Sequence, residues 1–173
     1  MQKTAPLLLG ACVAVPVAAQ AADLSLTVEV PQLKVSEYHR PYVAMWLERP
    51  DNTIAGNLAV WYQLPKAGKE NGEKWLKDMR QWWRRTGREL AMPVDGVTSA
   101  TRPVGKHTME FRNGAFPQGT LPAGQYVLKV EAAREVGGRE LVSVPFQWPP
   151  AKAQKLTATG KSELGEIVVD LKP

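Results

Sequence analysis

The stretch Asp23-Leu24-Ser25-Leu26-Thr27-Val28-Glu29-Val30 decides how the fold of this 173-residue chain is interpreted. From Leu24 to Val30, every apolar side chain is followed by a polar one. This period of two is typical of a strand with one face buried and the other in solvent. The stretch therefore predicts a β-strand that covers a core with one face.

Six further segments have strand-like composition, and turn signals such as Arg112-Asn113-Gly114 separate them. About seven short strands in one chain are typical of an antiparallel immunoglobulin-like sandwich, so the predicted fold class is mainly β. The six segments are 42–48, 58–62, 106–111, 125–133, 140–148 and 166–171.

One segment, between Gly72 and Thr86, follows a helical period instead, with Asn71 as the expected N-cap and Gly87 as the expected stop. We expect one amphipathic helix inserted in the β fold. Two interpretations of its basic face stay open: a solvated surface, or a contact with an acidic protein or an anionic membrane. The apolar positions are Trp75, Leu76, Met79, Trp82 and Trp83. The basic ones are Lys74, Lys77, Arg80, Arg84 and Arg85.

The N-terminus has the pattern of a secretory signal peptide. An apolar run over residues 5–19 leads to the small-residue site Ala19-Gln20-Ala21. We expect residues 1–21 to be removed, leaving residues 22–173 as a single periplasmic β-sandwich domain. Cys12 follows a short apolar stretch, so acylation of this cysteine as a lipoprotein anchor is the alternative.

Net charge and residue composition argue against nucleic-acid binding, thiol chemistry and a metal centre. The formal net charge is +5, but an exported chain has little occasion to meet nucleic acid, so we expect no such partner. Cys12 is the only cysteine, and its removal would exclude disulfides and thiol catalysis. The two histidines, His39 and His107, lack metal-ligand spacing, so no metal centre is expected.

A second stretch, Asp95-Gly96-Val97-Thr98-Ser99-Ala100-Thr101, is rich in turn-forming and small residues. Asp-Gly favours a tight turn. The small side chains of Ser99 and Ala100 leave the Thr101 hydroxyl open to a bulky reagent. We expect an exposed, irregular loop over residues 93–105.

This heptad matches D-G-x-T-(S or G)-A-T, the acceptor pattern of extracytoplasmic flavin transferases, at every specified position. It resembles the site in the flavin subunits of sodium-pumping quinone reductases. There the transferase cleaves FAD and joins FMN to the last threonine through a phosphoester. The resemblance implies covalent FMN on Thr101, with the remaining specified residues as the recognition sequence. These residues are Asp95, Gly96, Thr98, Ser99 and Ala100.

Residues near the heptad are candidates for holding such a flavin. Arg102 is a candidate ion-pair partner for the FMN phosphate, and His107 is a candidate hydrogen-bond donor to the flavin. Trp46, Trp61 or an aromatic residue on the helix is a candidate for stacking on the ring, with a place in the sandwich core as the alternative.

Five segments carry a second resemblance: 41–48, 74–76, 95–105, 121–126 and 131–135. Together they resemble a family of predicted periplasmic proteins of unknown function, whose members are associated with PepSY-type membrane proteins and flavin transferases. The resemblance implies an electron carrier, rather than a stand-alone enzyme, partnered with a PepSY-type membrane reductase.

A non-catalytic periplasmic binding module is the alternative function, because immunoglobulin-like sandwiches commonly serve recognition. Gly124-Gln125-Tyr126 is similar to the start of a strand in periplasmic and flagellar-cap sandwich domains. In that interpretation, the basic face of the helix is the contact surface.

Overall fold

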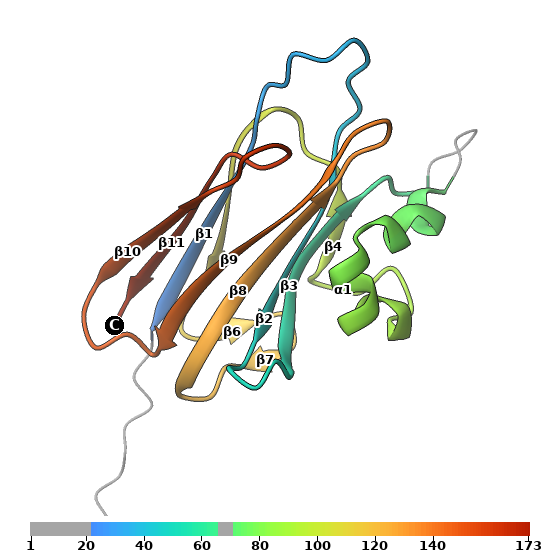
Figure 1. Ribbon diagram of the computed structural model, residues 1–173. Coiled ribbons are helices and arrows are strands. Elements are labelled where there is room, and N and C mark those ends of the chain that lie inside the picture. The colour runs from blue at the N-terminus through green and yellow to red at the C-terminus, as the bar shows by residue number, and fades with distance from the viewer. Residues whose placement is uncertain (1–21, 66–70) are drawn as a thin grey trace, which may run out of the picture.

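The computed structural model describes residues 22–65 and 71–173, which form a two-sheet β sandwich with short helices outside one sheet (Figure 1). The four-stranded sheet has the order β10–β11–β1–β5, and the five-stranded sheet has the order β4–β3–β2–β8–β9. The expected mainly β sandwich is confirmed. The strands are β1 (Asp23–Val30), β2 (Tyr42–Glu48), β3 (Ile54–Tyr62), β4 (Thr98–Ala100), β5 (Gly105–Phe111), β6 (Ala115–Phe116), β7 (Gly119–Thr120), β8 (Gly124–Ala133), β9 (Arg139–Trp148), β10 (Gln154–Thr159) and β11 (Glu166–Lys172).

β1 and β2 have different burial patterns because different layers cover them. β1 pairs with β11 and β5, and its residues alternate between buried and partly exposed because only one face meets the other sheet. β2 lies between β3 and β8 and is buried without interruption from Val43 to Glu48. Its second face is covered by the helical segment, so both faces carry mainly apolar side chains.

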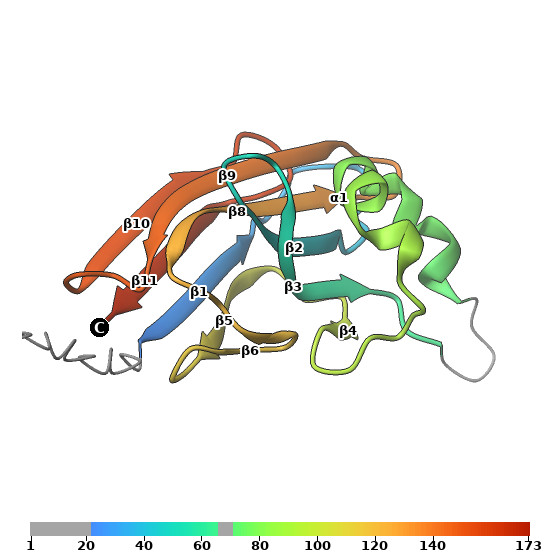
Figure 2. The ribbon, with the colours of Figure 1, turned by 90° about the horizontal axis from the view of Figure 1, so that it is seen from below.

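The helical segment lies across the outer face of the five-stranded sheet (Figure 2). The single helix expected here is wrong, because the segment breaks at Met79, whose ψ of 72° is not helical. Asn71 is the N-cap as expected, since its side chain accepts a hydrogen bond from the Glu73 backbone N–H at 3.0 Å. The pieces are the 3-10 helix η1 (Gly72–Asp78), the α-helix α1 (Arg80–Arg85) and the 3-10 helix η2 (Gly87–Glu89).

A second apolar core fills the space between this sheet and the helical segment. Trp82 is fully buried in it, and its indole N–H donates to Asn57 Oδ1 at 2.9 Å. Trp75 was expected on the same face but is 46% exposed, because the 3-10 geometry of η1 turns it away from the sheet. The buried members of this core are Ala44, Trp46, Val60, Tyr62, Leu76, Met79, Trp82, Val97 and Ala133.

Four strands fall outside the segments that the sequence pattern indicated: β4 and β10, which complete the two large sheets, and β6 and β7, which pair as a separate two-stranded sheet. β10 is an edge strand of the four-stranded sheet. β4 pairs in parallel with β3, whereas the other pairings within the two sheets are antiparallel. The expected signal peptide and Cys12 lie outside the described residues. In residues 22–65 and 71–173, no helix is long and apolar enough to cross a membrane.

Candidate functional site beside Thr101

The heptad forms a tight turn followed by a short strand. Val94 N–H donates to Thr98 Oγ1 at 2.8 Å, and Thr98 N–H donates to the Val94 carbonyl at 2.9 Å. Gly96, between them, has a φ of +68°, in the left-handed region that favours glycine. β4 follows, and Thr101 N–H then donates to the Tyr62 carbonyl at 3.2 Å. The expected irregular loop is therefore wrong for residues 98–101, which pair with β3, whereas the tight turn expected at Asp95-Gly96 is present.

The two threonines of the heptad have different roles in the structure. Thr98 uses its hydroxyl within the turn, whereas Thr101 is partly exposed and lines a pocket. Asp95, Gly96 and Ala100 are exposed. The heptad thus presents most of its recognition residues to solvent and its last threonine to a cavity.

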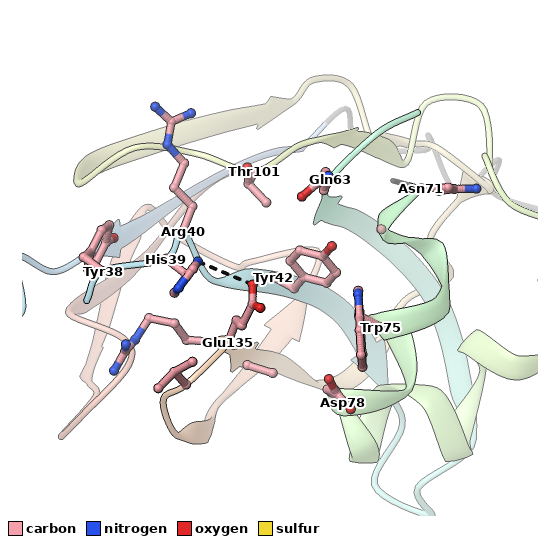
Figure 3. A pocket seen from close by; sticks show the side chains of 14 residues that line it. Tyr38, His39, Arg40, Tyr42, Gln63, Asn71, Trp75, Asp78, Thr101 and Glu135 are labelled. Atoms are coloured by element: carbon pink, nitrogen blue, oxygen red, sulfur yellow. Dashed lines mark ion pairs between the residues drawn. The ribbon is translucent and has the colours of Figure 1, made fainter. Parts of the chain in front are cut away.

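The pocket has a volume of about 550 Å³ and lies at the end of the sandwich where β3, β4 and β8 end and β2 begins (Figure 3). Residues 38–40 and 133–136 form one side, and η1 with Trp75 forms another. Tyr42 lies between these two sides in Figure 3. Small-molecule sites usually occupy roughly 300–1,000 Å³, so this cavity can take a ligand of cofactor size.

One corner of the pocket depends on a close approach of η1 to β3. Gly72 N–H donates to the Gln63 carbonyl at 3.1 Å. A Cβ at Gly72 would lie 2.1 Å from Tyr42 Oη, so only glycine fits there. Burial raises the pKa of Tyr42 above its ordinary value, although a backbone hydrogen bond from Gln63 opposes the rise. The phenol therefore stays neutral at ordinary pH.

Charged groups gather on the side of the pocket formed by residues 38–40 and 133–136. His39 lies between two carboxylates, 3.0 Å from Glu37 and 3.4 Å from Glu135. The buried Arg134 binds Glu163, with its Nε at 2.8 Å and its Nη2 at 3.2 Å from the carboxylate oxygens. These pairs leave the pocket with mixed charge rather than a strong field of one sign.

Two polar atoms on this side lack a hydrogen-bond partner within the described part of the chain. They are the hydroxyl of Tyr38 and Nη1 of Arg134, and both are covered from solvent. Burial raises the pKa of Tyr38, while the positive charges of Arg134 and Arg40 oppose the rise. The hydroxyl therefore keeps its proton and remains a hydrogen-bond donor.

Arg102 and His107 lie close to Thr101 in sequence but are not among the residues that line the pocket. The Arg102 guanidinium lies over the Trp61 ring, 5.4 Å from its centroid, and is exposed. His107 Nε2 is 2.7 Å from the Pro103 carbonyl oxygen, and its ring meets Trp61 edge-on. Their roles toward a flavin stay predictions.

Trp46 and Trp61 are fully buried, which overturns both as ring-stacking candidates. Trp61 belongs to the core between the sheets, and Trp46 to the core beneath the helical segment. Neither lines the pocket, because β2 and β3 are covered on both faces at these positions. Trp75 of η1 is the tryptophan at the pocket.

The basic face of the helical segment is largely exposed, so both interpretations of it stay open. Arg85 is the exception, because its Nε lies 3.3 Å from the buried carboxylate of Glu48 and its guanidinium also donates to the Asn52 carbonyl. The exposed members are Lys74, Lys77, Arg80 and Arg84. Within residues 22–65 and 71–173, no three histidine, cysteine or acidic side chains come together as a metal site.

Comparison with known proteins places the chain in a family. The model of the family described as "Predicted periplasmic protein (DUF2271)" matches residues 23–166, which is most of the chain. The chain belongs to the DUF2271 family. No curated protein and no solved structure matches it.

The match covers every pocket residue of this DUF2271 protein, including those that sequence reasoning missed. Tyr38 and Arg134 are the main omissions. They come from the β1–β2 and β8–β9 connections, which are far apart in sequence. The sequence analysis singled out His39, next to Tyr38, and the segment 131–135, which contains Arg134. Neither feature indicated that the two connections lie close together.

Proposed function

We propose that this DUF2271 protein is an exported electron carrier with FMN joined to Thr101 through a phosphoester. One observation carries the proposal. Thr101 is the last residue of a complete acceptor heptad and also lines a pocket of about 550 Å³. A ring system tethered at this hydroxyl would therefore begin beside a cavity of suitable size.

The residues around the pocket suit a flavin. Tyr42 and Trp75 supply aromatic surface for a planar ring. Tyr38 and Arg134 supply hydrogen-bond donors that have no partner among the described residues. FMN would provide the reversible electron transfer, and the protein would set its position and potential.

The attachment step needs FAD and a flavin transferase. Thr101 Oγ1 forms a bond to the flavin-side phosphorus of FAD, and the bond from that phosphorus to the bridging oxygen breaks. AMP leaves with the electron pair, and the hydroxyl proton passes to a base of the transferase, so no group changes oxidation state. The exposed Asp95, Gly96 and Ala100 are available for recognition by the transferase.

A PepSY-type membrane protein is the proposed electron donor. The family description as periplasmic supports an extracytoplasmic setting, where a free cofactor diffuses away and a covalent one is retained. The exposed cations of the helical segment, from Lys74 to Arg84, offer a surface for an acidic partner or anionic membrane.

The alternative function is a non-catalytic binding module. The same exposed basic residues favour it, because they form a contact surface outside the sandwich whether or not a cofactor is present. In this case Thr101 remains unmodified and the pocket serves another purpose.

Co-expression with a flavin transferase tests the proposal. The wild-type protein should give a fluorescent band in a denaturing gel and an intact mass increased by one FMN less one water. Thr101→Ala should abolish both signals, while Thr108→Ala, at an exposed threonine on β5, should retain them. A colourless wild-type protein, or fluorescence that survives in Thr101→Ala, contradicts the proposal.

A further inference from the structure

The unpartnered atoms of Tyr38 and Arg134 need an explanation, because buried polar groups in proteins are nearly always hydrogen-bonded. They are the only side-chain atoms of this kind among residues 22–65 and 71–173, and both residues line the same pocket. Burying two donors without hydrogen bonds raises the free energy of the folded protein. A ligand that offers acceptor atoms to both donors would remove this cost.

Arg134 is held firmly in its position. Glu163 binds two of its nitrogens and also accepts the Gly138 N–H at 2.7 Å. Gly137 packs so closely that a Cβ there would lie 2.4 Å from the guanidinium carbon. Val136, in the same turn, has a φ of 52°, a strained conformation for a β-branched residue. The turn therefore fixes the guanidinium while leaving Nη1 without a partner.

Tyr38 lies in the connection between β1 and β2, which has no regular secondary structure. Its hydroxyl and Arg134 Nη1 are both covered in the ligand-free protein, so a ligand reaches these two donors only after the Tyr38 side chain and its mostly exposed segment move aside. Because Tyr38 and Arg134 both donate, the ligand edge that faces them must carry acceptors.

Aromatic surface lies across the pocket from these donors. Figure 3 shows Tyr38 and Trp75 on opposite sides, with Tyr42 and Glu135 between them. Trp75 is 46% exposed, and the Lys74 ammonium lies 4.9 Å from its ring centroid. An exposed tryptophan facing a cavity is suited to cover a flat apolar ring.

We infer that this pocket binds a planar heteroaromatic ligand with its carbonyl edge toward Tyr38 Oη and Arg134 Nη1 and its apolar edge toward Trp75. The inference rests on the proposed function in that the expected ligand is the isoalloxazine ring tethered at Thr101. Its pyrimidine carbonyls then face the Arg134 charge, which favours the more negative, reduced form of the ring and raises its potential. Tyr38 and Arg134 are positioning residues for the ring.

Riboflavin is the probe, because it carries the ring but no phosphate and cannot be attached to Thr101. It is titrated into protein made without a transferase, and quenching of flavin fluorescence reports binding. Wild type and Thr108→Ala, at an exposed threonine that does not line the pocket, should bind it equally. Tyr38→Phe should weaken binding by roughly three- to tenfold, the value of one neutral hydrogen bond. Trp75→Ala should weaken it as well.

Thermal unfolding of the ligand-free protein separates a binding role from a structural one. Tyr38→Phe should leave the melting temperature unchanged or raise it, because the lost hydroxyl has no partner. Tyr126→Phe is the matched control, since its hydroxyl donates to the Pro122 carbonyl at 2.8 Å. It should lower the melting temperature and leave riboflavin affinity unchanged.

The outcomes separate this inference from the proposed function. If riboflavin binds but the transferase attaches no FMN, the result supports the pocket assignment and contradicts covalent attachment at Thr101. Attachment at Thr101 without riboflavin binding supports the tether and overturns the pocket assignment. Equal binding by wild type and Tyr38→Phe, or a lowered melting temperature in Tyr38→Phe, also overturns it.

Discussion

Glu131 and Arg134 lie three residues apart, in and just after β8, and both are buried, yet their surroundings differ. The Glu131 carboxylate accepts hydrogen bonds from the backbone N–H groups of Gln81 and Trp82, at 3.0 and 2.7 Å, and from Arg139 at 2.7 Å. Arg134 is bonded on one side only, and its Nη1 faces no acceptor within the described residues.

The difference distinguishes a structural charge from one that is available to a ligand. Glu131 joins the sheet to the first turn of α1, where its charge also suits the positive end of the helix. Both of its carboxylate oxygens accept hydrogen bonds from groups inside the protein. Arg134 and Tyr38 line one cavity, and each keeps a covered donor without a partner among the described residues, which a ligand would bond once the donor is uncovered.

The strongest test of this comparison is Glu131→Ala. The substitution leaves two backbone N–H groups without acceptors and Arg139 without its partner, so we expect a loss of about 3–5 kcal/mol in the free energy of unfolding. Urea unfolding measures it. Glu135→Ala, at an exposed carboxylate beside His39, is the control and should cost less than about 1 kcal/mol. Similar losses of unfolding free energy in both variants would show that Glu131 is not a structural charge.

A second fully bonded carboxylate, Glu140, should show the same behaviour as a function of pH. Burial raises its pKa, but hydrogen bonds from the backbone N–H groups of residues 161–164 outweigh burial and hold the pKa below the ordinary value of 4.5. A lowered pKa in the folded state stabilises the protein above the unfolded pKa. This stabilisation should therefore be present at neutral pH and disappear as the pH falls below about 4.5.

Glu140→Gln should lose about 2 kcal/mol at pH 7 and lose less stability than wild type between pH 5 and pH 3. Urea unfolding across this range provides the measurement. Glu110→Gln, which removes an exposed pair with Arg112, is the control and should lose less than about 1 kcal/mol at pH 7. A Glu140→Gln curve parallel to wild type would contradict the assignment.

The strands differ in how well the sequence predicts them. β1 and β2 were predicted with their observed bounds, because their apolar patterns are continuous from end to end. β10, with the sequence Gln-Lys-Leu-Thr-Ala-Thr, is an edge strand with few apolar residues and gave no signal. The helical segment was recognised, but its break at Met79 depends on packing against the sheet.

The site was predictable only where its residues are adjacent in sequence. The heptad identified Thr101, and its turn chemistry was recognised from Asp-Gly, but its pairing with β3 depends on a long-range contact. Tyr38 and Arg134 meet because strand order brings the β1–β2 and β8–β9 connections to one end of the sandwich. A pattern in the sequence does not show that these two connections lie close together in space.

The smallest expected effect concerns the exposed basic surface. Arg84 is exposed, and among the described residues it donates only to the Arg80 carbonyl and the Gln81 side chain, both in its own segment. Arg84→Glu should therefore change the free energy of unfolding by no more than about 0.5 kcal/mol. Urea unfolding checks it, and a loss above about 1 kcal/mol would show that this face is structural. A stable Arg84→Glu protein can then be used to test whether the basic face binds a partner. Arg85 is unsuitable for this test, because it pairs with the buried Glu48 and a charge reversal there would disturb the core.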